Sequence, residues 1–390
     1  MRSSTRFGDG ISFVAWMLLW LLGSVVVIVL MGYDIFLKSI DRIIGRDFSN
    51  LWVAGKLVWA GDPGCAFDVN CFRLAMYRDL DVLALQNYSY PPPALFIAAP
   101  FALVPYYVAL AAWTVLGALF FIWCTRPFLP KGFPPFLAVL TPAATINIWN
   151  GHYGFLLGGL WLLCFRNLER KPKRAGIFAG LLTLKPHLGL LIAATIVRNW
   201  RALAAAVLTT FALAILSGLA FGPAPWNGFL FGTTAEQQQI LTRSSPEFYF
   251  RMMPSAFVAF GRGIPGIIAQ VISALAAIAL LVRHRKWDTF SAATATFLIV
   301  PYVFNYDMVV ACLGFAIALY ARWNSMGWFE RATFIVAFVS PELTFYVPVV
   351  IPVALLSALH LQLRQLDAAR GAQAGSEGHP VNSPASSVTI

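Results

Sequence analysis

Ten apolar runs of roughly membrane-spanning length constrain this 390-residue chain more than any other feature. A helix that crosses a bilayer needs about 20 mostly apolar residues, and in lipid the backbone satisfies its hydrogen bonds only within helices or closed barrels. We therefore predict an all-α polytopic membrane protein with about 10 to 12 transmembrane helices. The runs lie at 13–31, 101–123, 133–149, 153–165, 202–221, 264–282, 288–303, 308–321, 332–346 and 348–363.

Charge supports the same class and predicts the orientation. Only 12% of the residues are charged and the mean hydropathy is +0.72, whereas soluble domains carry about 25% charged residues. If the N-terminus is cytoplasmic, 18 of the 28 basic residues fall on one face and nine on the other. By the positive-inside rule the richer face is cytoplasmic. The net charge of +11 thus reports topology, and we expect membrane lipids but no nucleic acid as partners.

The predicted organisation is one transmembrane domain over residues 1–369, followed by a disordered cytoplasmic tail over 370–390. We expect both termini in the cytoplasm and a bacterial-type inner (plasma) membrane as the location. The first apolar run has no small-residue cleavage site after it, so we interpret it as a retained helix. Two external loops are long, at 32–100 and 222–263, and such loops usually carry function.

The first external loop contains an amphipathic pattern. Apolar residues recur at helical spacing from Phe48 until Gly61-Asp62-Pro63 ends the pattern, which predicts a surface helix with Asp47 at its N-terminus. After Tyr90, three prolines stop any helix, and the apolar piece 94–105 is too short to span. Cys65 and Cys71 in this loop are either joined in a disulfide or free.

Residues 175–197 lie between two basic flanks that both favour the cytoplasm, yet they are long enough for only one crossing. Pro186 can break a helix near the middle. We therefore predict a hairpin of two short helices with Lys185 and His187 at its apex. Irregular backbone at membrane depth is permitted only where it lines protein or a water-filled cavity.

Several polar residues are candidates for chemistry. An ionisable group at membrane depth is costly unless it is paired or serves a cavity. Lys185 with His187 would suit an anion such as a phosphate, and the alternative is a structural pair with one acid. Asp47, Asp34 and Asp41 follow the first span, where a carboxylate could act as a general base or simply cap a helix.

Two short external turns add further candidates on the same face. One carries Asn150 and His152, and the other carries Tyr306 and Asp307. Their structural alternatives are a turn residue for His152 and a helix cap for Asp307. There is no CxxC or HExxH motif and no Gly-rich nucleotide cradle, so we expect no metal and no cofactor. Without a cytosolic domain, a transferase would need a lipid-borne donor.

An ordered set of motifs resembles glycosyltransferase family 87, from residue 15 to about residue 325. One departure is His152, where the family pattern more often has Gln. The matching pieces are Gly45-Arg46-Asp47-Phe48, Gly61-Asp62-Pro63, Tyr90-Pro91-Pro92-Pro93, Pro100-Phe101-Ala102-Leu103-Val104-Pro105, Asn150-Gly151-His152, Gly176 to Pro186 and Tyr306-Asp307.

The resemblance implies an integral membrane mannosyltransferase of the C-type glycosyltransferase fold, with residues 1–369 as its catalytic domain. It implies a polyprenyl-phosphate sugar donor, inversion at the anomeric carbon, and Asp47 as the catalytic base. We expect Lys185, His187 and His152 to bind the donor phosphate, and Asp34, Tyr90, Asn150, Tyr306 and Asp307 to contact substrate. We expect the acceptor to be a glycolipid or a polysaccharide of the cell envelope, with a protein as the alternative. The rival interpretation is a secondary transporter or flippase of lipid-linked sugars.

Overall fold

The structure of the chain is a computed structural model that describes residues 17, 18, 22, 43–82, 88–233, 250–285 and 287–377, with side chains up to residue 370. Every regular element in these ranges is helical, as predicted. The first predicted span at 13–31 lies almost wholly outside them, as do Asp34 and Asp41.

Four described helices are long and apolar enough to cross a membrane, at Tyr106–Phe128, Trp200–Phe221, Ile264–His284 and Asn305–Ser325. They contain α5 (Tyr106–Thr125) with η3 (Arg126–Phe128), α10 (Trp200–Phe221), α15 (Ile264–His284), and η8 (Asn305–Met308), α17 (Val309–Arg322) and η9 (Trp323–Ser325). Several other predicted spans form shorter helices, whereas the run at 348–363 lies mostly within the 28-residue α19 (Val350–Glu377). The run at 153–165 becomes the 14-residue α7 and the run at 288–303 the 11-residue α16, which at 1.5 Å per residue fall short of a bilayer core of about 30 Å.

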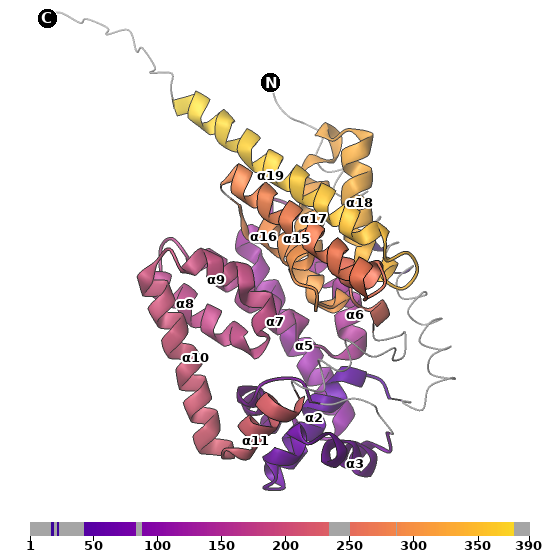
Figure 1. Ribbon diagram of the computed structural model, residues 1–390. Helices are drawn as coiled ribbons and strands as arrows, with labels where there is room; N and C mark the ends of the chain where they lie inside the picture. Colours follow the sequence, from indigo (N-terminus) through magenta and orange to yellow (C-terminus); the bar gives the residue numbers. More distant parts are fainter. Residues whose placement is uncertain are drawn as a thin grey trace, which may run out of the picture.

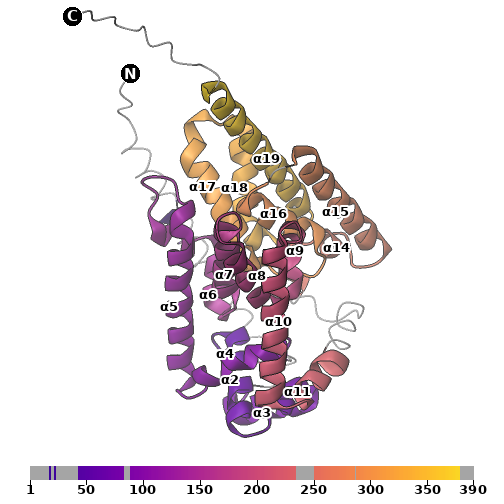
Figure 2. The same ribbon diagram turned by 90° about the vertical axis from the view of Figure 1, so that its left-hand side faces the viewer.

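The first long loop forms a helical layer at one end of the molecule. Figures 1 and 2 show α2, α3 and α11 together there, beside the end of α10. The predicted amphipathic helix is present as α2, and Trp52 Nε1 and Trp59 Nε1 hold it to the α4 segment by donating to the carbonyls of Val104 and Ala99. The elements of this layer are α2 (Arg46–Trp59), η1 (Pro63–Phe67), α3 (Val69–Leu80), η2 (Pro92–Ala94), α4 (Leu95–Phe101), α11 (Ala224–Asn227) and the π-helical turn η7 (Gly228–Thr233).

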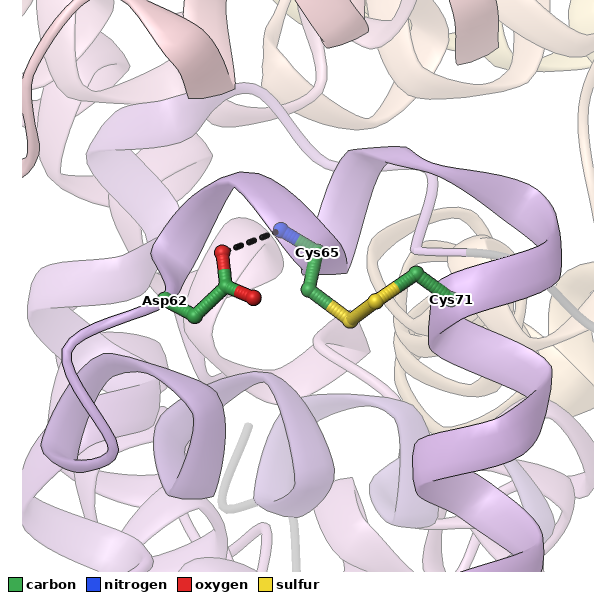
Figure 3. A group of neighbouring side chains, drawn as sticks. All are labelled: Asp62, Cys65 and Cys71. Carbon is green, nitrogen blue, oxygen red and sulfur yellow. Dashed lines mark hydrogen bonds between the residues drawn. A yellow bond between two sulfur atoms is a disulfide. The ribbon is translucent and has the colours of Figure 1, made fainter.

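A disulfide joins Cys65 to Cys71 in this layer, with their Cα atoms 5.3 Å apart (Figure 3). Asp62 lies beside them, and these three residues are the one set of potential metal ligands within the described ranges. Both sulfurs are committed to the disulfide, and the Asp62 carboxylate accepts a hydrogen bond from Cys65 N at 3.3 Å. The cluster therefore has a structural explanation as a capped turn closed by a crosslink.

The predicted hairpin at 175–197 is confirmed. The chain breaks between η5 (Leu182–Leu184) and η6 (Pro186–Gly189), with α8 (Pro172–Leu181) before and α9 (Leu190–Ile196) after the break. A Cβ on Gly176 would lie 2.1 Å from the Ala202 carbonyl oxygen, and one on Gly180 2.6 Å from Thr209 Cβ. Thus α8 runs parallel to α10, and the basic segments that precede these two helices lie at the same end of the pair.

The remaining helices pack around this core. Figure 1 shows α15 to α19 gathered at the end away from α2 and α3. Helix α19 continues to Glu377, so the tail predicted from residue 370 begins with helix, and 378–390 lie outside the described residues. The bounds are η4 (Pro135–Val139), α6 (Pro142–Asn150), α7 (Gly154–Asn167), α14 (Ala256–Ala259), α16 (Thr289–Ile299), α18 (Trp328–Leu343) and α19 (Val350–Glu377).

Candidate active site

Asp47 lies in the first turn of α2 without capping the helix. The N-cap is Gly45, whose φ of 75° is left-handed, and no side chain among the described residues caps this end. The Tyr106 hydroxyl fixes the start of the helix by donating to the carbonyls of Ile44 and Gly45 at 2.7 and 2.8 Å. The capping explanation for Asp47 therefore fails, and its carboxylate, 30% exposed, is left for another contact.

That contact is His152, which the turn after α6 holds in a fixed position. The main-chain N–H groups of Gly151 and His152 both donate to the Asn147 carbonyl, and the Asn147 side chain accepts from Gly154 N at 2.8 Å. Trp113 Nε1 reaches the carbonyls of Gly151 and His152 at 3.1 and 3.3 Å. Because backbone and indole both pin the turn, the imidazole has little freedom, and it is only 3% exposed.

Asp47 and His152 form an ion-pair contact, with Asp47 Oδ2 2.7 Å from His152 Nε2. The Nε2 atom makes no well-directed hydrogen bond within the described residues. Burial raises the pKa of Asp47, but the charges of His152, Arg46 and Lys185 outweigh it and hold the pKa below its usual value. Burial lowers the pKa of His152, against the opposing charge of Asp47. Asp47 is thus ionised at neutral pH, which is the form that a general base requires.

Lys185 and Asp307 form a second pair, fully inside the protein. Lys185 Nζ lies 2.5 Å from Asp307 Oδ2, with side-chain exposures of 8% and 0%. Asn305 anchors the η8 turn that carries Asp307, since its Nδ2 donates to the Pro341 carbonyl at 2.8 Å. Asp307 Oδ1 is buried without a hydrogen-bond partner in the described residues. The structural alternative for Lys185, a pair with one acid, therefore has its partner in Asp307. The second oxygen of Asp307 is still able to accept a hydrogen bond from a ligand.

Tyr306 lies between the two pairs and joins them. Its ring stacks on His152 with centroids 3.2 Å apart, and Lys185 Nζ lies 4.7 Å from its centroid. Phe304 stacks nearby at 5.1 Å from Tyr306. The two ion pairs, which come from α2, the α6–α7 turn, the hairpin apex and η8, therefore belong to one site.

Tyr90 completes the site from the side of the first loop. Its ring packs on Tyr153 with centroids 4.1 Å apart. Burial raises the pKa of Tyr90, and the nearby charges of Asp307 and Asp47 raise it further, so the phenol stays protonated and can donate a hydrogen bond. The predicted residues Asp47, Tyr90, His152, Lys185, Tyr306 and Asp307 thus converge.

Two further predicted residues have other positions. The Asn150 amide donates back to the Ile146 carbonyl at 3.1 Å and so serves helix α6. His187 lies at the apex with its ring edge-on to Tyr302 at 5.5 Å, and its Nε2 is buried without a hydrogen-bond partner in the described residues. The sequence reasoning missed Asn147 and Trp113, although the Asn-Gly-His turn that they hold was a visible signal.

An apolar groove opens beside the site between α5 and α7. Its volume is about 150 Å³, and His152 and Asn147 are among the residues that line it. The lining residues are Phe101, Trp113, Thr114, Leu116, Gly117, Phe120, Asn147, Gly151, His152, Phe155 and Leu156.

The fold and site define a helical membrane protein with an accessible carboxylate beside a buried Lys–Asp pair. Residues 88–341, more than half of the chain, match glycosyltransferase family 87. The chain therefore belongs to glycosyltransferase family 87, which confirms the resemblance. No curated protein and no solved structure matches the chain. Asp47 precedes the matched residues, so its position in the site rests on the geometry alone.

Proposed function

We propose that this glycosyltransferase moves a sugar, mannose in the first instance, from a polyprenyl-phosphate donor to a glycolipid or polysaccharide acceptor. The transfer takes place at the outer face of a bacterial-type inner membrane and inverts the anomeric centre. The observation that supports it best is the convergence of Asp47–His152 and Lys185–Asp307 on Tyr306 in a family of glycosyltransferases. Family membership favours transfer over the transporter alternative.

Asp47 is the base in this proposal because it is the accessible member of its pair. Its side chain is 30% exposed, whereas His152 is 3% exposed and covered by Tyr306. An acceptor hydroxyl gives its proton to Asp47 as its oxygen bonds to the anomeric carbon. His152 acts as a positioning residue that holds the carboxylate in place.

Lys185 stabilises the leaving group. The bond between the anomeric carbon and the phosphate oxygen breaks, and the departing polyprenyl phosphate gains negative charge. A positive group held in a site of low dielectric constant is well suited to offset that charge. In the structure Asp307 balances Lys185, so the donor phosphate must share or replace this contact. The unpartnered Asp307 Oδ1 can accept a hydrogen bond from a sugar hydroxyl.

The test is transfer by the purified full-length chain in lipid nanodiscs. Polyprenyl-phosphate mannose, polyprenyl-phosphate arabinose and a nucleotide-activated mannose are supplied in parallel with an envelope glycolipid extract. We expect product from a polyprenyl-phosphate donor only, with an inverted anomeric centre by NMR. Transfer from the nucleotide sugar, retention of configuration, or no transfer from any lipid donor would refute the proposal. Mass spectrometry of envelope glycans from cells lacking the chain then identifies the acceptor.

A further inference from the structure

Six exposed cations gather on the two turns that flank the hairpin, one between α7 and α8 and the other between α9 and α10. Glu169 is the one acidic residue in these two turns. Within the described part of the chain, no ion pair uses any of the six side chains. We call this set the basic cluster, and its members are Arg170, Lys171, Lys173, Arg174, Arg198 and Arg201.

Close packing of α8 against α10 brings the two turns together. Figure 2 shows α8 and α9 beside the first part of α10. A Cβ on Gly176 would lie 2.1 Å from the Ala202 carbonyl oxygen, so the two helices touch near their N-terminal ends. The Asn199 side chain caps α10 by accepting from Arg201 N and Ala202 N at 3.1 and 3.4 Å. The cations of both turns therefore form one positive surface.

The basic cluster lies where a membrane surface would meet α10, which is a candidate span. Beside the cluster, Trp200 is 72% exposed and Val197 is 59% exposed. The Arg201 guanidinium lies 5.8 Å from the centroid of the Trp200 ring. Exposed tryptophan and arginine at the end of a span are typical of the headgroup level of a bilayer. The cluster therefore faces lipid phosphates, on the side that we expect to be cytoplasmic.

A second apolar groove starts beside the cluster, between the hairpin and α10. We call it the hairpin groove, and its volume is about 260 Å³. Ile196 lines it and is two positions before Arg198, which is at most about 7 Å along the chain. Two hydroxyl groups line it as well, but Thr183 and Thr210 donate theirs to main-chain carbonyls one turn earlier. The groove thus presents an apolar lining that suits an acyl chain.

The proposed sugar donor is not the lipid that fits this arrangement. Lys185, which we expect to bind the donor phosphate, follows the far end of α8 from the cluster. The ten residues of α8 span about 15 Å. A donor phosphate at Lys185 therefore does not occupy the cluster, and the cations there need a different anion.

We propose that the basic cluster and the hairpin groove together bind one anionic phospholipid of the membrane. Its phosphate lies among the arginines, and one of its acyl chains lies in the groove. Pro186, which follows Lys185, also lines the groove, so the bound chain supports the hairpin apex that carries Lys185. This site is independent of the identity of the sugar donor and of the transfer reaction.

The first experiment measures binding to the wild-type chain in phosphatidylcholine nanodiscs. The probe is phosphatidylglycerol with a photoreactive diazirine in one acyl chain. We expect labelling of groove residues in α8, α9 and α10, with loss of label when unlabelled phosphatidylglycerol is added. Three results would each overturn the proposal: competition by soluble glycerol phosphate, stronger competition by a polyprenyl phosphate, or equal labelling by a diazirine phosphatidylcholine.

The second experiment compares two double variants that lose the same charge. Arg174→Gln with Arg201→Gln removes two cations of the cluster, whereas Arg126→Gln with Arg283→Gln removes two exposed arginines elsewhere on the expected cytoplasmic face. A basic residue near an anionic lipid surface contributes about fivefold in affinity. The cluster variant should therefore bind phosphatidylglycerol about 25-fold more weakly, and the control should bind almost normally. Equal losses in the two variants would show an effect of net charge alone and would contradict the proposed site.

The third experiment fills the hairpin groove. A Cβ added to Gly189 would meet no described atom within 4 Å, so Gly189→Leu places its side chain in open space of the groove. The matched control is Ala212→Leu, at an exposed position of α10 that does not line the groove. Phosphatidylglycerol should raise Tm for the wild type and for Ala212→Leu, but not for Gly189→Leu. An equal rise in all three proteins overturns the proposal, and if Gly189→Leu fails to fold, the labelled positions in the wild type decide.

Discussion

Asp47→Asn separates catalysis from stability at the proposed base. The substitution keeps size and polarity but removes the ability to accept a proton. Because Gly45 is the N-cap of α2 and Asp47 does not cap it, the helix loses no cap. The main structural loss is the charged contact with His152, made by a carboxylate that is 30% exposed. Such a contact is worth about 1 kcal/mol, so we expect a folded protein.

The kinetic loss should be far larger. Removal of a general base typically slows reaction by about 10² to 10⁴, which is about 2.7 to 5.4 kcal/mol in the activation barrier. The donor should still bind, because Lys185 is untouched. We therefore expect a collapse of kcat in the nanodisc transfer assay, with binding of the polyprenyl-phosphate donor retained.

Asp68→Asn is the matched control in the same loop. Asp68 caps α3 by accepting from Cys71 N at 2.8 Å, and Asn caps a helix about as well. This variant should keep both activity and thermal stability. From the sequence we also expect Asp34→Asn and Asp41→Asn to keep much of their activity. A fully active Asp47→Asn would refute the assignment, and a simultaneous loss in Asp34→Asn would move the base upstream.

The other predictions test the second pair, the positioning residue and the topology. Lys185→Met alone leaves the buried Asp307 unpaired and should lower the free energy of unfolding by about 3–5 kcal/mol. The double variant Lys185→Met with Asp307→Asn should regain thermal stability but still fail to bind the donor. Normal donor binding by the double variant would mean that the pair has only a structural role. His152→Gln removes the charge that holds down the pKa of the catalytic carboxylate, so the acid limb of the pH–rate profile should move to higher pH, and an unmoved limb would contradict the pairing. In intact cells an impermeant thiol reagent should label the Cys65–Cys71 site only after an impermeant reductant, and an engineered Cys at Lys173 only after permeabilisation; the reverse pattern would invert the topology.

The sequence predicted the local structure of the site well, because helices and helix breaks depend mainly on residues that are close together in the chain. Apolar spacing after Phe48 predicted α2, and Pro186 between two short apolar runs predicted the hairpin break. The span count was less secure. A hydropathy window records apolar composition, but α7 and α16 show that a buried helix in a large helical protein is equally apolar while too short to cross a bilayer.

Pairing within the site could not be deduced from the sequence. Lys185 and Asp307 are 122 residues apart, and nothing local distinguishes Asp307 from the other acids as the partner. Likewise, a cap and a base have the same sequence pattern at Asp47, and only the observed N-cap and the His152 contact separate them.

Composition and hydropathy pattern were enough to define the class of protein and the residues able to do chemistry. Lipid leaves the backbone no partner but itself, so long apolar runs must be helical, and an ionisable side chain among them must be paired or exposed to a cavity. Which of these groups meet became visible in the folded chain, because contacts such as His152 on Tyr306 depend on how distant helices pack. Packing also made the groove beside His152, since it forms where α5 and α7 leave space that no short stretch of sequence encodes.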